Sequence, residues 1–196
     1  MLKIAITGNI AAGKSAAENF LSEQGYTVTD TDEITHFLLK KSSVKEKIYL
    51  CFKGYDIFNE NGEIDRKKLG KIVFNNSGLL KQLEKIVHPA VIEEINKFFD
   101  RNKNKELVFV SVPLLYETNM TYLFDKVIII CADDEIRKKR LTEKRGFSLD
   151  EAESRMNSQM PQEEKIKSAD FVIYNNSDLN NFSNQLNRVI KGITNL

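Results

Sequence analysis

The stretch that decides the fold is "GNIAAGKS", Gly8–Ser15, which follows the apolar run "LKIAIT", Leu2–Thr7. Glycine, four variable residues and Gly-Lys-Ser form the pattern of a loop whose backbone N–H groups cradle phosphate oxygens. An apolar strand precedes this pattern and a helical one, "KSAAENFLSEQG", follows it, which is the order that such a loop requires. A chance match in a glycine-containing turn is the alternative, and the strand–loop–helix order favours phosphate binding over it.

The residue types in the loop match this chemistry. Gly8 and Gly13 allow backbone conformations that other residues resist. We expect the Lys14 side chain to reach the β- and γ-phosphates of ATP and the Ser15 hydroxyl to bind Mg²⁺. The residues predicted to bind the nucleotide here are Gly8, Ala11, Ala12, Gly13, Lys14, Ser15 and Ala16.

The rest of the chain argues against a GTP-dependent switch. No glycine has an aspartate three positions before it, and "NKNK" and "NKFF" lack the aspartate of a base-reading motif. A kinase for a small acceptor is therefore the natural interpretation.

Composition sets further limits. The 196 residues suit one domain with small insertions, and 29 basic against 28 acidic residues give a net charge of +1. We therefore expect small-molecule substrates, with no nucleic acid and no membrane as partner; the oligomeric state is left open. The longest apolar run, Val127–Ala132, is far shorter than the roughly 18 residues of a membrane helix, and we expect no signal peptide ahead of the first strand. A cytoplasmic protein is expected, with Cys131 buried and reduced.

Hydrophobic patterning predicts an α/β fold. Continuous apolar runs, typical of parallel strands covered on both faces, occur at Leu2–Thr7, Tyr26–Thr29, Leu107–Val112, Lys126–Cys131 and Phe171–Tyr174. Helical patterns separate them. The strandless block from Asp32 to Lys103 indicates a helical insertion. A charged stretch from Asp133 indicates two helices joined at Gly146 that form a mobile cover.

Carboxylates follow the second strand in "TDTDEITH". The carboxyl ends of strands border the ligand crevice of an open α/β sheet, so Asp30 or Asp32 could orient an acceptor hydroxyl and take its proton. The alternative is that these acids cap a helix, and both roles can hold together.

As a whole, the chain resembles the dephospho-CoA kinase family. The resemblance depends on the order of seven stretches: "TGNIAAGKS", "DTDEITH", "IVHPAV", "VPLLYE", "RLTEKRG", "RMNSQMP" and "ADFVIYN". It implies ATP- and Mg²⁺-dependent phosphorylation of the ribose 3′-hydroxyl of dephospho-CoA, the final step of coenzyme A biosynthesis. It also implies a three-layer P-loop NTPase fold with a parallel five-stranded sheet: a core at 1–32, 104–134 and 169–196, a helical CoA-binding insertion at about 33–103 and a lid at about 135–168.

The resemblance also assigns residues by position. Asp32 matches the family's proposed base, and Arg140 matches a lid arginine that closes over ATP phosphates. Asn175 matches a position near the adenine. The residues implied on the acceptor side are Asp30, Asp32, His88, Pro113, Leu114, Leu115, Glu117 and Arg155. Without the resemblance, His88 is a partly buried histidine ahead of a helix, and the two leucines are as readily core residues as contacts.

Other positions depart from the family or have a plainer interpretation. The family loop usually has glycine where Asn9 and Ala11 stand, so Asn9 must tolerate the backbone geometry there. Gly146 replaces the usual lid acid. Gln159 lies four residues after Arg155, which indicates one helix face. The basic run Arg137–Lys139 is predicted to be a solvated helix face.

Two other functions compete with this interpretation. A nucleoside monophosphate kinase would share the loop and lid but would not need "HP" and "VPLLYE". A non-catalytic ATP-binding regulator would not need the paired aspartates on the acceptor side.

Overall fold

The computed structural model describes residues 1–194. These residues form two compact units, one made of Met1–Asp30 together with the chain from Asn102 onward, the other of Thr31–Arg101. The second unit is the block in which the sequence predicts an insertion at about 33–103.

The first unit is built on a parallel five-stranded sheet, which confirms the predicted α/β class. The strands lie in the order β2-β3-β1-β4-β5. Their bounds are β1 Leu2–Thr7, β2 Thr27–Asp30, β3 Leu107–Ser111, β4 Lys126–Cys131 and β5 Phe171–Tyr174. Because the strands are parallel, all five carboxyl ends meet at one edge of the sheet, where an open α/β sheet binds its ligand.

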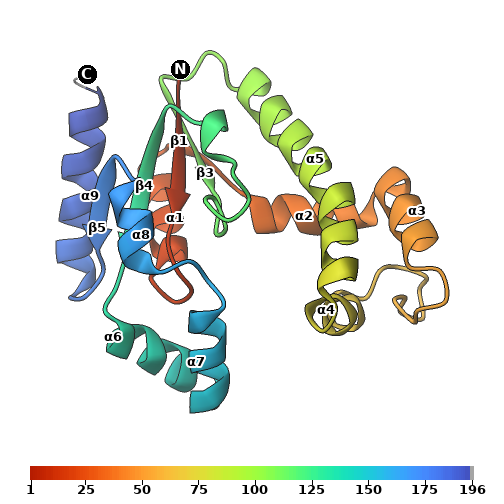
Figure 1. The fold of residues 1–196 in the computed structure, drawn as a ribbon. Helices are drawn as coiled ribbons and strands as arrows, with labels where there is room; N and C mark the ends of the chain where they lie inside the picture. The colour runs from red at the N-terminus through yellow and green to blue at the C-terminus, as the bar shows by residue number, and fades with distance from the viewer. Residues whose placement is uncertain (195–196) are drawn as a thin grey trace. The chain divides into compact units, whose positions relative to one another are not determined.

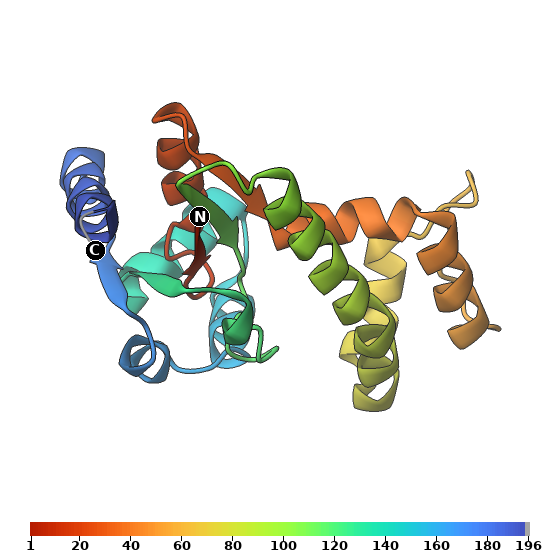
Figure 2. The same ribbon diagram turned by 90° about the horizontal axis from the view of Figure 1, so that it is seen from above.

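Helices cover both faces of this sheet (Figures 1 and 2). Helices α1 (Lys14–Glu23) and α9 (Leu179–Thr194) pack on one face, and α8 (Gln162–Lys167) lies on the other. The core between the sheet and the helices α1 and α9 includes Ile4, Ile6, Phe109, Ile128, Ile130, Leu21, Phe182 and Leu186. Burial on both faces explains why the strands have continuous apolar runs rather than alternating ones.

Two strands differ by one residue from the prediction. The second strand lies at Thr27–Asp30 rather than Tyr26–Thr29, because Asp30 pairs with Ser111 of β3. The third strand ends at Ser111 rather than Val112, since the chain leaves the sheet ahead of Pro113, which has no N–H to give to the ladder.

The charged stretch forms helices, as predicted. It contains α6 (Asp134–Lys139), a π-helical turn η2 (Arg140–Lys144) and α7 (Leu149–Asn157), with Gly146 between the last two. A short 3₁₀ turn, η1 (Thr121–Leu123), precedes β4.

The regular secondary structure of the second unit is helical, apart from one isolated bridge, Phe58–Ile64, in the segment between α3 and α4. It consists of α2 (Thr31–Lys40), α3 (Ser42–Cys51), α4 (Arg66–Phe74) and the long α5 (Ser77–Arg101). On α5, Val87, Val91, Ile95 and Phe99 are buried at intervals of four residues, and this apolar stripe packs against the other three helices. No helix within residues 1–194 has the length and apolar character needed to cross a membrane.

Candidate active site

The loop Gly8–Gly13 connects β1 to α1, and the positions of its two glycines do not accept another residue. Gly8 has φ +152°, and a Cβ there would lie 2.3 Å from the carbonyl oxygen of Ile130. Gly13 has φ +112°, and a Cβ there would lie 2.0 Å from Nδ2 of Asn175. At Gly8 both the conformation and the nearby Ile130 backbone require glycine, and at Gly13 the conformation does, as the sequence pattern indicates.

The sequence predicts an unusual backbone conformation at Asn9, but the structure has this conformation at Ala11 instead. Ala11 has φ 61°, in the left-handed region, whereas Asn9 has no positive φ. Asn9 is buried, and its side-chain amide donates to the carbonyl oxygen of Met160 at 3.0 Å. Its polar side chain is thus used in a contact between the loop and a segment about 150 residues further along the chain.

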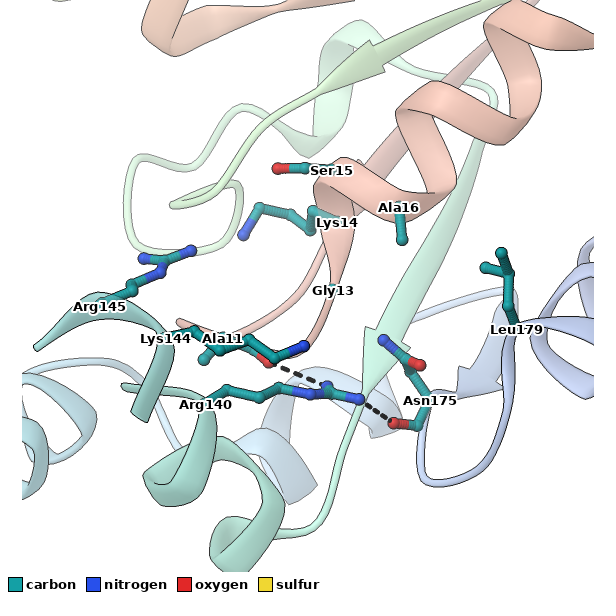
Figure 3. A pocket seen from close by; sticks show the side chains of 10 residues that line it. All are labelled: Ala11, Gly13, Lys14, Ser15, Ala16, Arg140, Lys144, Arg145, Asn175 and Leu179. Carbon is teal, nitrogen blue, oxygen red and sulfur yellow. Dashed lines mark hydrogen bonds between the residues drawn. The ribbon is translucent and has the colours of Figure 1, made fainter. Parts of the chain in front are cut away.

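Beside the loop lies a cavity of about 350 Å³ (Figure 3). It is lined by Ala11, Gly13, Lys14, Ser15, Ala16, Arg140, Lys144, Arg145, Asn175 and Leu179. Four of these side chains are cationic and none is a carboxylate. A cavity with several cations and a helix N-terminus suits a polyanion such as a nucleotide phosphate chain.

The two arginines of this cavity have different positions. Arg140 donates from Nη1 to the carbonyl oxygens of Ala11 (3.1 Å) and Ala12 (3.2 Å), and from Nη2 to that of Asn175 at 2.7 Å. Burial lowers the pKa of its guanidinium, although arginine stays charged. In Figure 3 the Arg140 guanidinium extends toward Asn175, whereas that of Arg145 extends on the side of Lys14. Arg140 therefore contacts the loop itself in this structure.

The π-helical turn η2 explains how both arginines line one cavity. Arg140 begins the turn, and Arg145 follows it five residues later. A π-helix bonds residue i to i+5, so side chains five positions apart come close to the same face.

Asn175 holds the loop from another side. It follows β5, and its Nδ2 donates to the carbonyl oxygen of Ala12 at 2.8 Å. Lys14 donates from Nζ to the carbonyl oxygen of Gly8 at 2.9 Å. The predicted residues Gly13, Lys14, Arg140 and Asn175 are thus brought together around one loop.

The segment after β3 contributes a mixture of buried and exposed groups. Leu115 is fully buried and belongs to the core, whereas Leu114 is exposed and Pro113 half-buried. Glu117 forms an ion pair with Lys165 of α8, with 2.7 Å between Oε1 and Nζ. The same oxygen accepts from the amide N–H of Met160 at 3.2 Å. The structure thus gives the two leucines different environments and ties Glu117 to α8.

The remaining predicted residues divide between the two units. Asp30 ends β2 in the sheet unit. Asp32 is exposed in the first turn of α2, and His88 is half-buried, both in the helical unit. His88 lies inside α5 rather than ahead of a helix, because α5 continues through Pro89.

Two positions of the predicted lid also differ from a continuous helix face. Arg155 lies over the ring of Phe147 at 4.4 Å from the centroid, an exposed cation–π contact. Gln159 lies beyond the end of α7 at Asn157, so the two do not share a helix. Its Oε1 instead accepts from the amide N–H of Ile10 at 2.7 Å.

Sequence reasoning missed Lys144 and Leu179, which also line the cavity. Leu179 begins α9 directly after the loop that follows β5. Its position just beyond the carboxyl end of a parallel strand was a usable signal. Within residues 1–194, no group of three or more His, Cys, Asp or Glu side chains could hold a metal ion.

The parallel sheet, the glycine loop leading into α1 and the cationic cavity at the carboxyl edge define a P-loop kinase. The family model for dephospho-CoA kinase matches residues 2–181. The chain belongs to the dephospho-CoA kinase family, whose members catalyse the last step of coenzyme A biosynthesis and use ATP as a substrate.

Individual relatives and solved structures are similar to this chain over nearly its whole length. A dephospho-CoA kinase of Fusobacterium nucleatum subsp. nucleatum is 38% identical over 190 residues, covering 97% of each chain. The crystal structure of TT1252 from Thermus thermophilus has a TM-score of 0.85 at 32% identity, over 98% of this chain and 96% of that one. The dephospho-CoA kinase of Campylobacter jejuni has a TM-score of 0.73 at 32% identity, over 97% and 96%.

Proposed function

We propose that this chain transfers the γ-phosphoryl group of ATP to the ribose 3′-hydroxyl of dephospho-CoA, giving coenzyme A and ADP. The observation that carries the proposal is the cationic cavity around Lys14 in a chain of this family. In the reaction, the acceptor oxygen forms a bond to the γ-phosphorus, and the bond from that phosphorus to the β,γ-bridging oxygen breaks.

The residues of the cavity would bind and orient the nucleotide. Lys14 and Arg145 extend on one side of it, where they would neutralise charge on the transferred group. The backbone N–H groups of the loop would bind phosphate oxygens. Asn175 and Leu179 line the part of the cavity opposite the two cations and would contact the nucleoside.

A magnesium ion fits the donor set at the start of α1. Mg²⁺ in such sites takes few protein ligands and is completed by phosphate oxygens and water. The Ser15 hydroxyl lines the cavity beside Lys14 and would be its protein ligand. When bound, the ion would neutralise charge on the β- and γ-phosphates.

On the acceptor side, we propose Asp32 as the group that takes the proton of the 3′-hydroxyl, with Asp30 beside it in sequence. The helical unit, approximately 33–103, would bind the acceptor, with a contribution from His88. The segment from Pro113 to Glu117 and the lid at about 135–168, including Arg155, would complete the site. A cytoplasmic location is part of the same proposal.

The test is mass spectrometry of dephospho-CoA incubated with ATP, Mg²⁺ and the protein. The expected result is an acceptor mass increased by one phosphate group, only when ATP is present. Nucleoside monophosphates serve as a parallel panel of acceptors. Phosphorylation of one of them in place of dephospho-CoA would overturn the proposal, and so would tight ATP binding without transfer to any acceptor.

A further inference from the structure

The carbonyl groups of the phosphate-binding loop are held by side chains from elsewhere in the sheet unit. Those of Ala11 and Ala12 accept from Arg140, and that of Ala12 also from Asn175. The carbonyl oxygen of Ile10 accepts from Nε of Arg137 at 3.0 Å. A trans peptide unit directs its C=O and N–H to opposite sides, and the structure contains no cis peptide bond in residues 1–194. Fixing the Ile10 carbonyl therefore fixes the direction of the Ala11 N–H.

Arg137 is not the surface residue that its charged surroundings indicate. It is 3% exposed, whereas Lys139, two positions later on the same helix, is exposed. Its Nη1 donates to Asp134 at 2.8 Å, and the Asp134 side chain is 68% exposed. A pair with an exposed aspartate does not require a buried guanidinium, because a lysine could make it at the surface. The other contact of this buried guanidinium reaches the phosphate-binding loop, at the carbonyl oxygen of Ile10.

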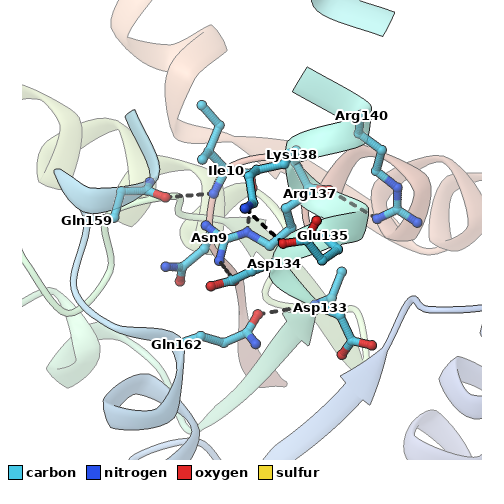
Figure 4. Close-up of polar contacts among 12 residues, drawn as sticks. Asn9, Ile10, Asp133, Asp134, Glu135, Arg137, Lys138, Arg140, Gln159 and Gln162 are labelled. Carbon is cyan, nitrogen blue, oxygen red and sulfur yellow. Dashed lines mark hydrogen bonds and ion pairs between the residues drawn. The ribbon is translucent and has the colours of Figure 1, made fainter. Parts of the chain in front are cut away.

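Both polar backbone atoms of Ile10 are held by side chains (Figure 4). Its N–H donates to Gln159 at 2.7 Å and its carbonyl accepts from Arg137. The peptide planes on either side of Ile10 are thus fixed independently, one from the segment after α7 and one from α6. Ala11, which follows, has a left-handed conformation and lines the cavity.

We propose that Arg137 is a positioning residue for the nucleotide site. Its planar guanidinium donates to both Ile10 and Asp134. It thereby holds the Ile10–Ala11 peptide in an orientation that leaves the Ala11 N–H available to a phosphate oxygen. A lysine can replace one of these contacts but not both. The proposal rests on the proposed use of this cavity for ATP phosphates, and it assigns Arg137 no contact with the nucleotide.

The test compares Arg137→Met and Arg137→Lys with the wild type. The matched control is Lys139→Met, which removes one positive charge from an exposed position of the same helix. The primary measurement is the Kd for ADP with Mg²⁺ by calorimetry, since it needs no acceptor. KM for ATP, kcat and the melting temperature are measured beside it.

We expect Arg137→Met to weaken ADP binding and raise KM for ATP by roughly tenfold, the effect of losing one charge-assisted hydrogen bond. Arg137→Lys should recover part of this loss, and Lys139→Met should stay within about twofold of the wild type. A residue with a structural role alone would lower the melting temperature of Arg137→Met without changing its ADP affinity.

That outcome would overturn the proposal, as would equal weakening by Lys139→Met. If Arg137→Met does not fold, Arg137→Lys decides, and an ADP affinity equal to that of the wild type refutes the role. A wild type that binds ADP but phosphorylates no dephospho-CoA refutes the proposed function alone, since the ADP comparison still tests Arg137. A wild type that binds no ADP refutes both.

Discussion

Lys165 is fully buried, and its ion pair with Glu117 joins α8 to the segment after β3. In Lys165→Met the apolar stem of the side chain is retained but the charge is lost, so the Glu117 carboxylate loses its ion-pair partner and keeps the Met160 N–H. Removing one member of a buried pair costs about 3–5 kcal/mol. Because the Glu117 side chain is 23% exposed and can be partly hydrated, we expect about 3 kcal/mol, the lower end of that range.

The assay is urea unfolding followed by far-UV circular dichroism. Because the chain has two compact units, hydrogen exchange of the β4 amides is measured in parallel, since α8 contacts β4. The double variant Lys165→Met/Glu117→Gln removes both charges and should recover part of the lost free energy of unfolding. Lys167→Met, on the exposed side of the same helix, is the control.

A loss below about 1 kcal/mol in Lys165→Met, the range of a surface ion pair, would refute this reasoning. So would a double variant no more stable than the single one. Glu117→Gln also tests the predicted acceptor role of Glu117. If Glu117 contacts dephospho-CoA, loss of that contact should raise KM for this substrate.

Three further predictions concern the chemistry of the site and the core. Lys14→Ala should reduce turnover on the order of 10²–10³-fold with an unchanged melting temperature, measured by kinetics and calorimetry. Asp32→Asn should lower kcat on the order of 10²-fold while ADP binding persists, and Asp30→Asn should cost less; the reverse order in single-turnover rates would exchange their roles. Burial raises the pKa of the Cys131 thiol from 9.0 to about 11, so the folded state retains a proton that the unfolded state loses. Its contribution to stability is present below pH 9 and falls as the pH rises toward 11; Cys131→Val should flatten this decline in urea titrations.

The sheet could be predicted closely because its signal is local. The runs Leu2–Thr7, Lys126–Cys131 and Phe171–Tyr174 match β1, β4 and β5 residue for residue. A strand covered on both faces has apolar residues at consecutive positions, and this needs no knowledge of its neighbours. The phosphate-binding loop was predictable for a similar reason, since its glycines are required by backbone geometry within the loop and by close contacts.

The roles of Arg137 and Asn9 could not be predicted, because their partners lie far away in sequence. Arg137 donates to Ile10, 127 positions earlier, and Asn9 to Met160, 151 positions later. The charge pattern of α6 predicts a solvated helix face. Only the folded chain shows which of its basic residues is buried. The sequence predicts Gln159 on a helix face because the end of α7 at Asn157 has no strong local signal.

The π-helical turn Arg140–Lys144 makes the winding of the backbone the sensitive variable in the predicted lid. In an α-helix each position advances by about 100° around the axis, so side chains five positions apart point about 140° away from each other, whereas side chains four positions apart share a face. If the turn rewound as an α-helix at constant length, Arg145 would therefore rotate away from the cavity while Arg140 kept its contacts with the loop. Deleting the exposed Glu143 would instead place the two arginines four positions apart, the spacing that an α-helix brings to one face. In related kinases, these two arginines should therefore be five positions apart where the turn is π-helical and four apart where it is α-helical.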